Sequence, residues 1–151
     1  MRMKGSKPIF NDKDTWNMDA TLAPIICEGL KKFKEVISDP ECIAGYPCKV
    51  INAFDFGYGV EMEEDCIKEW HKIIDEMIYA FDSTNEPIIS DYDFDLEFMN
   101  VGKTEQGYIQ STIKCSDEYE YDLYKKDMEE WEQRCEKGRE LFAKYFKCLW
   151  R

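Results

Sequence analysis

The sequence has a single histidine, His71, among its 151 residues. Catalytic systems of the Ser-His-Asp or Cys-His kind use a histidine as general base, so His71 would have to serve in any such site. It falls within a predicted helix, one turn from Asp75, and no short motif marks a nucleophilic serine or cysteine. We therefore interpret His71 as a boundary residue paired with Asp75, and we predict no catalytic residue and no enzymatic activity.

Closely spaced cysteine pairs are also absent. The seven cysteines stand at irregular intervals, and the nearest combinations are Cys42 with Cys48 and Cys66 with His71. Structural zinc sites usually take cysteines about two to four residues apart, so we predict no metal site and no cofactor. An odd number of cysteines at such spacing favours reduced thiols and a cytoplasmic protein.

Long apolar runs are missing. No stretch approaches the roughly 18 apolar residues of a membrane-spanning helix. The first ten residues lack the apolar segment of a secretory signal peptide. The sequence therefore predicts a cytoplasmic protein that does not enter a membrane.

Positive charge is scarce: 20 lysines and arginines stand against 32 acidic residues, and the net charge is −12. Such a charge opposes binding to nucleic-acid phosphates and to anionic membranes, and it suits a protein partner with a basic surface. The deficit is concentrated between Asp82 and Asp122, where eleven acidic residues are opposed only by Lys103 and Lys114.

Apolar residues recur at three- and four-residue spacing in three segments, which predicts amphipathic helices at about 19–37, 62–82 and 121–149. Turn residues and β-branched residues predict a β-hairpin with arms at about 90–99 and 107–115. The fold class is therefore α+β and mainly α. We expect its core around Phe33, Trp70, Phe81, Trp131 and Phe142.

The predicted organisation is a single domain, 1–151, with an N-terminal arm, 1–18, and an acidic hairpin insertion, 86–116. Trp16 is expected to anchor the arm. Gly29 lowers the stability of the first predicted helix by about 1 kcal/mol relative to alanine. We interpret it as a candidate site of close packing between helices. The length of the last helix leaves open a homo-oligomer formed through residues 121–149.

Acidic and apolar residues alternate strictly from Asp91 to Phe98. On a β-strand this pattern places four carboxylates on one face, those of Asp91, Asp93, Asp95 and Glu97. Alternate side chains on a strand lie about 6.5–7 Å apart, a scale comparable with the spacing of backbone phosphates. We predict these four residues as a partner-binding site; the alternative is a solvated face of an ordinary strand.

Two ligand motifs nearly match this region and fail. Asp91, Asp93 and Asp95 begin like a calcium-binding EF-hand loop, but Leu96 stands where glycine is required, and Gly102 where glutamate is required. The run Gly102–Thr104 ends like a phosphate-binding loop, but the leading glycine is missing.

Three segments resemble a family of uncharacterised bacteriophage proteins. They are Asp14–Ala23 (DTWNMDATLA), Trp70–Phe81 (WHKIIDEMIYAF) and Gly138–Trp150 (GRELFAKYFKCLW). The resemblance implies a phage protein made in the cytoplasm of its bacterial host, and it supplies no catalytic residues.

In that setting the acidic surface favours an inhibitor of a host defence protein or nucleic-acid-binding protein, acting as an anti-CRISPR-like mimic of DNA. One alternative is a sponge that sequesters a signalling nucleotide, with Lys144, Lys147 and Arg151 near Trp150 as its basic and stacking residues. The other is a structural or assembly protein of the phage.

Overall fold

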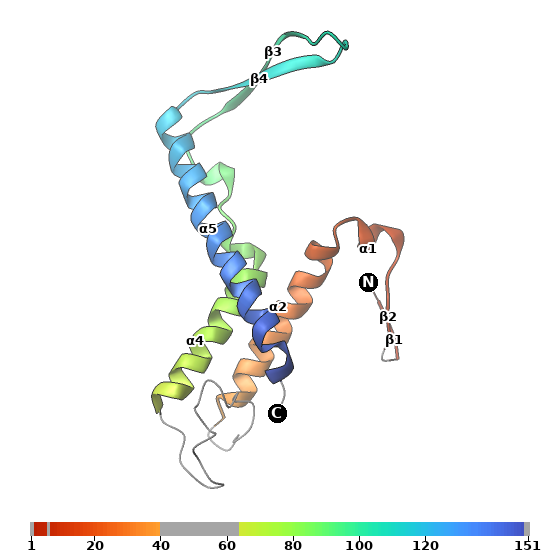
Figure 1. The fold of residues 1–151 in the computed structure, drawn as a ribbon, viewed down its shortest axis with the longest axis vertical. Helices are drawn as coiled ribbons and strands as arrows, with labels where there is room; N and C mark the ends of the chain where they lie inside the picture. The colour runs from red at the N-terminus through yellow and green to blue at the C-terminus, as the bar shows by residue number, and fades with distance from the viewer. Residues whose placement is uncertain (1, 6, 40–63, 150–151) are drawn as a thin grey trace. The chain divides into compact units, whose positions relative to one another are not determined.

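Three long helices hold more than half of the residues that the structure describes. The computed structural model describes residues 2–5, 7–39 and 64–149. Its long helices are α2 (Met18–Ile37), α4 (Glu64–Phe81) and α5 (Glu118–Tyr145), and a hairpin is formed by β3 (Leu96–Lys103) and β4 (Ile109–Cys115) (Figure 1). The short elements are β1 (Arg2–Lys4), β2 (Lys7–Ile9), α1 (Asp12–Trp16), η2 (Ser83–Asn85), η3 (Ile89–Asp91) and η4 (Phe146–Cys148). The predicted α+β, mainly helical fold is confirmed.

The chain divides into two compact units, and the division falls inside α5. Met1–Asn85 and Gln133–Arg151 form one unit, called here the helical unit, and Glu86–Glu132 form the other, called the acidic unit. The single domain with an arm at 1–18 and an insertion at 86–116 stays a prediction.

The core of the helical unit lies between α2, α4 and the last turns of α5. Trp70, Ile74 and Met77 are fully buried on α4, at the spacing of one helix face. Around them pack the remaining core side chains, from Leu30, Ile37 and Tyr145, with Phe33, Phe81 and Phe142 at the edge. Four of the five aromatic residues predicted for the core are therefore in it. Trp131 is half-buried and lies outside this cluster.

Gly138 marks a close approach of α4 and α5. A Cβ atom built on Gly138 would overlap the carbonyl oxygen of Glu76 and would lie 2.5 Å from the Cβ of Ala80. Gly29, the glycine predicted for this role, has nothing within 4 Å of such an atom. The prediction therefore chose the wrong glycine, because periodicity gives the buried face of a helix and not the distance to its neighbour.

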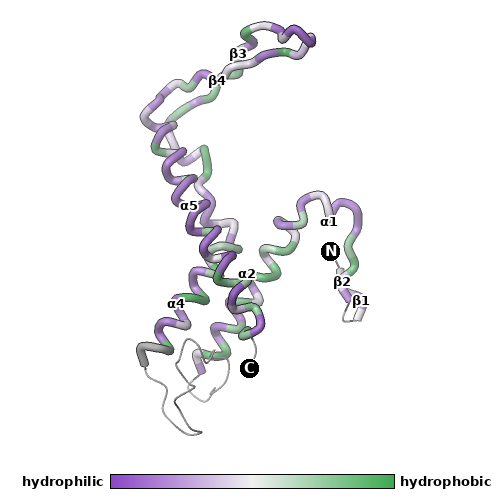
Figure 2. Tube along the Cα trace, viewed as in Figure 1, coloured by the Kyte–Doolittle hydropathy of each residue, from purple (hydrophilic) through white to green (hydrophobic). Residues whose placement is uncertain are grey.

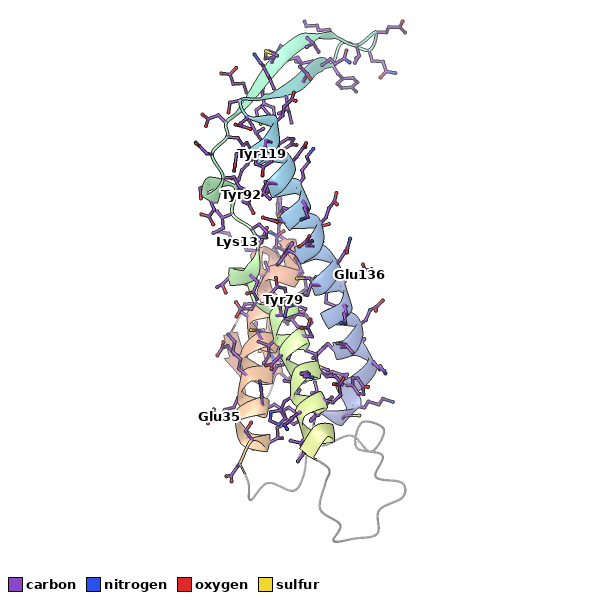
Figure 3. All side chains as sticks on the ribbon, turned by 90° about the vertical axis from the view of Figure 1, so that its left-hand side faces the viewer. Lys13, Glu35, Tyr79, Tyr92, Tyr119 and Glu136 are labelled. Atoms are coloured by element: carbon purple, nitrogen blue, oxygen red, sulfur yellow. The ribbon has the colours of Figure 1, made fainter. Side chains whose placement is uncertain are left out.

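Polar contacts flank this core on its solvent side. Arg134 donates to both carboxylate oxygens of Glu76 at 3.0 and 2.9 Å, and its guanidinium lies 3.7 Å from the ring centre of Tyr79, which is labelled in Figure 3. Lys31 lies 3.1 Å from Asp82 and joins α2 to the end of α4. These contacts link α4 to α5 and to α2.

The N-terminal segment contains three short elements, β1, β2 and α1, that were not predicted from the sequence. β1 and β2 pair antiparallel, and α1 begins with a capping box in which Asn11 and Asp14 each accept from the other's backbone N–H. Trp16 is 86% exposed at the end of α1. The prediction that Trp16 anchors this segment is therefore wrong for the described residues.

The acidic unit is built from the β3–β4 hairpin, the segment before it and the first half of α5. The ladder pairs Leu96 with Cys115 at one end and Lys103 with Ile109 at the other, with an irregularity between Asn100 and Gly102. The first strand was predicted near residue 90 and begins instead at Leu96. The last helix begins at Glu118, before the predicted residue 121.

Two further predictions concern the start of the second helix and membrane-spanning segments. The second helix was predicted from residue 62, but residues 62 and 63 lie outside the described residues. Within the described ranges, no helix is both long and apolar enough to cross a membrane.

Candidate functional site

The four carboxylates predicted as a contact surface are all exposed, but they do not share one strand. Asp91 ends the 3-10 turn η3, where its backbone N–H donates to the carbonyl of Ile88 at 2.9 Å. Asp93 and Asp95 follow in a segment outside the ladder, and Glu97 alone lies within β3. The prediction of one four-carboxylate strand face is therefore wrong. The alternation of exposed acidic and half-buried apolar residues is present from Asp91 to Leu96 and ends there, because Phe98 is 74% exposed.

Aromatic contacts hold the apolar residues of this segment against α5. The ring of Phe94 lies 5.4 Å from that of Tyr121 and 5.8 Å from that of Tyr124, and Tyr92 meets Tyr124 at 5.2 Å. Edge-to-face and tilted pairs at such distances are favourable. Figure 3 labels Tyr92 on this segment beside α5. The apolar side chains of this segment thus pack on a face of α5. The carboxylates between them, on the opposite side of the segment, are exposed to solvent.

A hydrogen bond from the Tyr92 hydroxyl to Asp127 adds to this packing. Its length is 2.7 Å, and acceptance by the carboxylate, with some desolvation, raises the pKa of Tyr92 to about 12. The proton therefore stays on Tyr92 at neutral pH. The contact links the segment before the hairpin to the third turn of α5.

The base of the hairpin is closed by Ser116 and Asp117. The Ser116 hydroxyl accepts from the backbone N–H of Asp95 at 2.7 Å, and the Ser116 N–H donates to the Asp95 carbonyl at 3.0 Å. Asp117 then accepts from the N–H groups of Tyr119 and Glu120 and so caps α5. Figure 3 labels Tyr119 in this first turn. The end of the ladder and the start of the helix are therefore fixed by neighbouring residues.

The net charge of the chain is concentrated in the acidic unit. Glu86–Glu132 contains 14 acidic residues and 4 lysines, a net charge of −10 out of −12. The hairpin itself is neutral, since Glu97 and Glu105 are balanced by Lys103 and Lys114 between Leu96 and Cys115. Figure 2 accordingly shows α5 as mostly hydrophilic, and the hairpin as mixed. The acidic surface therefore belongs to the flanks of the hairpin and to α5.

A shallow, open hollow of about 390 Å³ lies beside the segment before β3. It is lined by Ile89, Ser90 and residues 92–96, and so includes two of the predicted acidic residues, Asp93 and Asp95. Carboxylates suit a guanidinium or ammonium group. The hollow thus has the chemistry to receive a basic side chain.

His71 lies in the helical unit among charged neighbours. Burial lowers the pKa of His71, the positive charge of Lys34 lowers it further, and the carboxylate of Asp75 opposes both. Asp75 is itself 2.5 Å from the Nζ atom of Lys34. His71 is therefore half-buried beside Asp75, as predicted, in a structural ion-pair network.

Metal ligands do not gather in the part of the chain that the structure describes. No group of three or more His, Cys, Asp or Glu side chains there is arranged to hold an ion. Cys42 and Cys48 lie outside the described residues. For the nucleotide-sponge alternative, Lys144 and Lys147 are exposed, and Trp150 and Arg151 lie outside the described residues.

Comparisons with known proteins add no relative: no family model, no curated protein and no solved structure matches this chain. The resemblance to uncharacterised bacteriophage proteins therefore stays a hypothesis.

Proposed function

We propose that this chain is a phage-encoded, non-catalytic binding protein whose acidic unit engages the basic surface of a host defence protein or nucleic-acid-binding protein. The observation that carries the proposal is the concentration of charge: a net −10 within 47 consecutive residues, 86–132, that form one compact unit. A field of this kind attracts basic partners at high rates, and salt weakens the attraction.

The exposed carboxylates Asp91, Asp93, Asp95 and Glu97 are the proposed contact residues. The aromatic packing of Tyr92 and Phe94 on α5 fixes the segment that carries them, so presenting the carboxylates costs little conformational entropy on binding. The hollow beside Asp93 and Asp95 is the proposed seat of an arginine or lysine of the partner.

The test compares two variants of equal charge. The first replaces Asp91, Asp93 and Asp95 with Asn and Glu97 with Gln. The control removes four exposed carboxylates of the helical unit, those of Asp19, Glu69, Glu136 and Glu140. Each tagged protein is used to capture partners from a bacterial lysate, and captured proteins are identified and eluted with double-stranded DNA.

The expected result is a nucleic-acid-binding protein that the wild type and the control retain, that DNA displaces, and that the first variant loses. Each removed contact should also lower the salt dependence of binding. Equal retention by both variants would refute a role for the predicted carboxylates, and capture that DNA does not disturb would refute mimicry of DNA.

A further inference from the structure

The β3–β4 hairpin is a ribbon with no covering on either face in the described part of the chain. Every residue from Glu97 to Lys114 is exposed, including Phe98 at 74%, Ile109 at 65% and Ile113 at 53%. Phe98 is opposite Ile113 in the ladder, and Ile109 is on the same face of β4 because it lies four residues earlier. A two-stranded ribbon of this kind is only marginally stable in water.

The two edges of the ribbon differ in how they are protected. β3 is interrupted between Asn100 and Gly102, and Gly102 has a φ of 152°, so the bulge distorts this edge. β4 runs from Ile109 to Cys115 without proline, glycine or bulge, and Lys114 near its end is its one charged residue. Bulges, prolines and charges are the usual protection of an edge strand. The outer edge of β4 is therefore open to pairing.

We propose that β4 is a docking strand, and that an extended segment of the partner, basic at its ends, pairs with its outer edge. This inference rests on the proposed function and names the way in which the partner is held. Strand addition supplies backbone hydrogen bonds, and alternate side chains of the added strand meet the face that carries Ile109 and Ile113. Apolar residues at those positions would cover a surface that is now exposed to water.

Charge decides between a partner and a second copy of this chain. The hairpin is neutral, but Asp95 lies at its base and Asp117, Glu118 and Glu120 follow shortly after β4. A second acidic unit would bring a further −10 to the same place, and like charges at an interface are unfavourable. A strand with lysine or arginine at both ends places one of them at this acidic base, whichever way the strand runs.

The test uses the full chain, labelled with ¹⁵N, and a synthetic peptide probe, acetyl-Lys-Val-Thr-Val-Thr-Val-Lys-amide. The matched control peptide has proline in place of both threonines, so its charge is equal but two backbone donors are missing. We expect the first peptide to slow hydrogen exchange of the β4 amides and to shift their resonances. We expect the proline peptide to bind about tenfold more weakly, from the loss of two hydrogen bonds.

Two protein variants separate this inference from the proposed function. Ile113→Ser should weaken the peptide about fivefold, by loss of apolar contact, while cross-strand contacts of the hairpin persist in the spectra. The triple variant Asp91→Asn, Asp93→Asn, Asp95→Asn should bind the peptide more weakly, by a factor that falls as salt is added. At peptide saturation its β4 amides should still be protected from hydrogen exchange.

Unchanged β4 amides at peptide saturation, or equal affinity for the two peptides, would overturn strand docking and leave the electrostatic proposal standing. Protection of β4 that the triple variant does not weaken would support docking and count against the carboxylates. Sedimentation that detects a dimer of the protein alone, with β4 amides already protected, would overturn the proposal in favour of a second copy.

Discussion

Replacing Gly138 with alanine should open the contact between α4 and α5. The added Cβ would overlap the carbonyl oxygen of Glu76 and lie 2.5 Å from the Cβ of Ala80, whereas real Cβ atoms essentially never approach another atom within 3.0 Å. Both obstacles are parts of a helix and not the ends of flexible side chains. The two helices would therefore have to separate, and the ring of Tyr79 and the guanidinium of Arg134 would shift with them.

Two opposing terms set the size of the effect. Alanine is better than glycine in a helix interior by about 1 kcal/mol. Overpacking at a close-packed contact costs about 1–3 kcal/mol, and the severity of this overlap points to the upper end. We therefore expect Gly138→Ala to lower the free energy of unfolding by about 1–2 kcal/mol.

The assay is urea unfolding followed by far-ultraviolet circular dichroism. Gly29→Ala is the matched control, because Gly29 also lies inside a helix and has nothing within 4 Å of an added Cβ. It should raise the free energy of unfolding by about 0.5–1 kcal/mol, since only the helix propensity changes.

A gain in stability for Gly138→Ala equal to that of Gly29→Ala would refute the close approach of α4 and α5. The double variant Gly138→Ala, Ala80→Gly gives a second check. It removes the clash with Ala80 and leaves the clash with the Glu76 carbonyl, so it should not restore wild-type stability.

Two further predictions test other contacts. Asp82 has its pKa lowered to about 2 by hydrogen bonds from Thr84 and Lys31, so its stabilisation is present above about pH 4 and is lost as the pH falls towards 2. Asp82→Asn should therefore cost about 1 kcal/mol at pH 7 and almost nothing near pH 2, as measured by urea unfolding at both values; an equal cost at both would contradict the ion pair. Phe94→Ala should cost about 2 kcal/mol, because Phe94 packs on Tyr124, whereas Phe98→Ala at an exposed position should change stability by less than about 0.5 kcal/mol. Equal costs in thermal unfolding would contradict the packing of Phe94 on α5.

The helices could be predicted closely because their signal is local. The apolar spacing of Trp70, Ile74 and Met77 leaves one solution for the buried face of α4. The predicted start of α2 is within one residue of Met18, and its predicted end, Ile37, is the observed one. The predicted start of α5 is three residues too late, because apolar spacing does not register a first turn that is polar. An aspartate followed by acidic residues in a first turn is also a capping signal, and Asp117 acts as one.

The candidate site was predicted in part, for a physical reason. Alternation from Asp91 to Phe98 reports an extended chain with one face against something apolar, and it does not say whether that something is a strand or a helix. Here the aromatic residues pack on Tyr121 and Tyr124 of α5, a contact between segments far apart in sequence. Exposure of the carboxylates followed from the pattern; the positions of Asp91, Asp93 and Asp95 outside the ladder did not.

The neutrality of the hairpin within so acidic a unit has a consequence for the behaviour of the protein in solution. An unprotected edge such as β4 is a template for aggregation, and mutual repulsion between acidic units holds such edges apart. That repulsion has a range of about 10 Å at 0.1 M salt and about 3 Å at 1 M. The carboxylates around the hairpin thus act as its gatekeepers, and concentrated salt would remove the repulsion that keeps one molecule's β4 from the next.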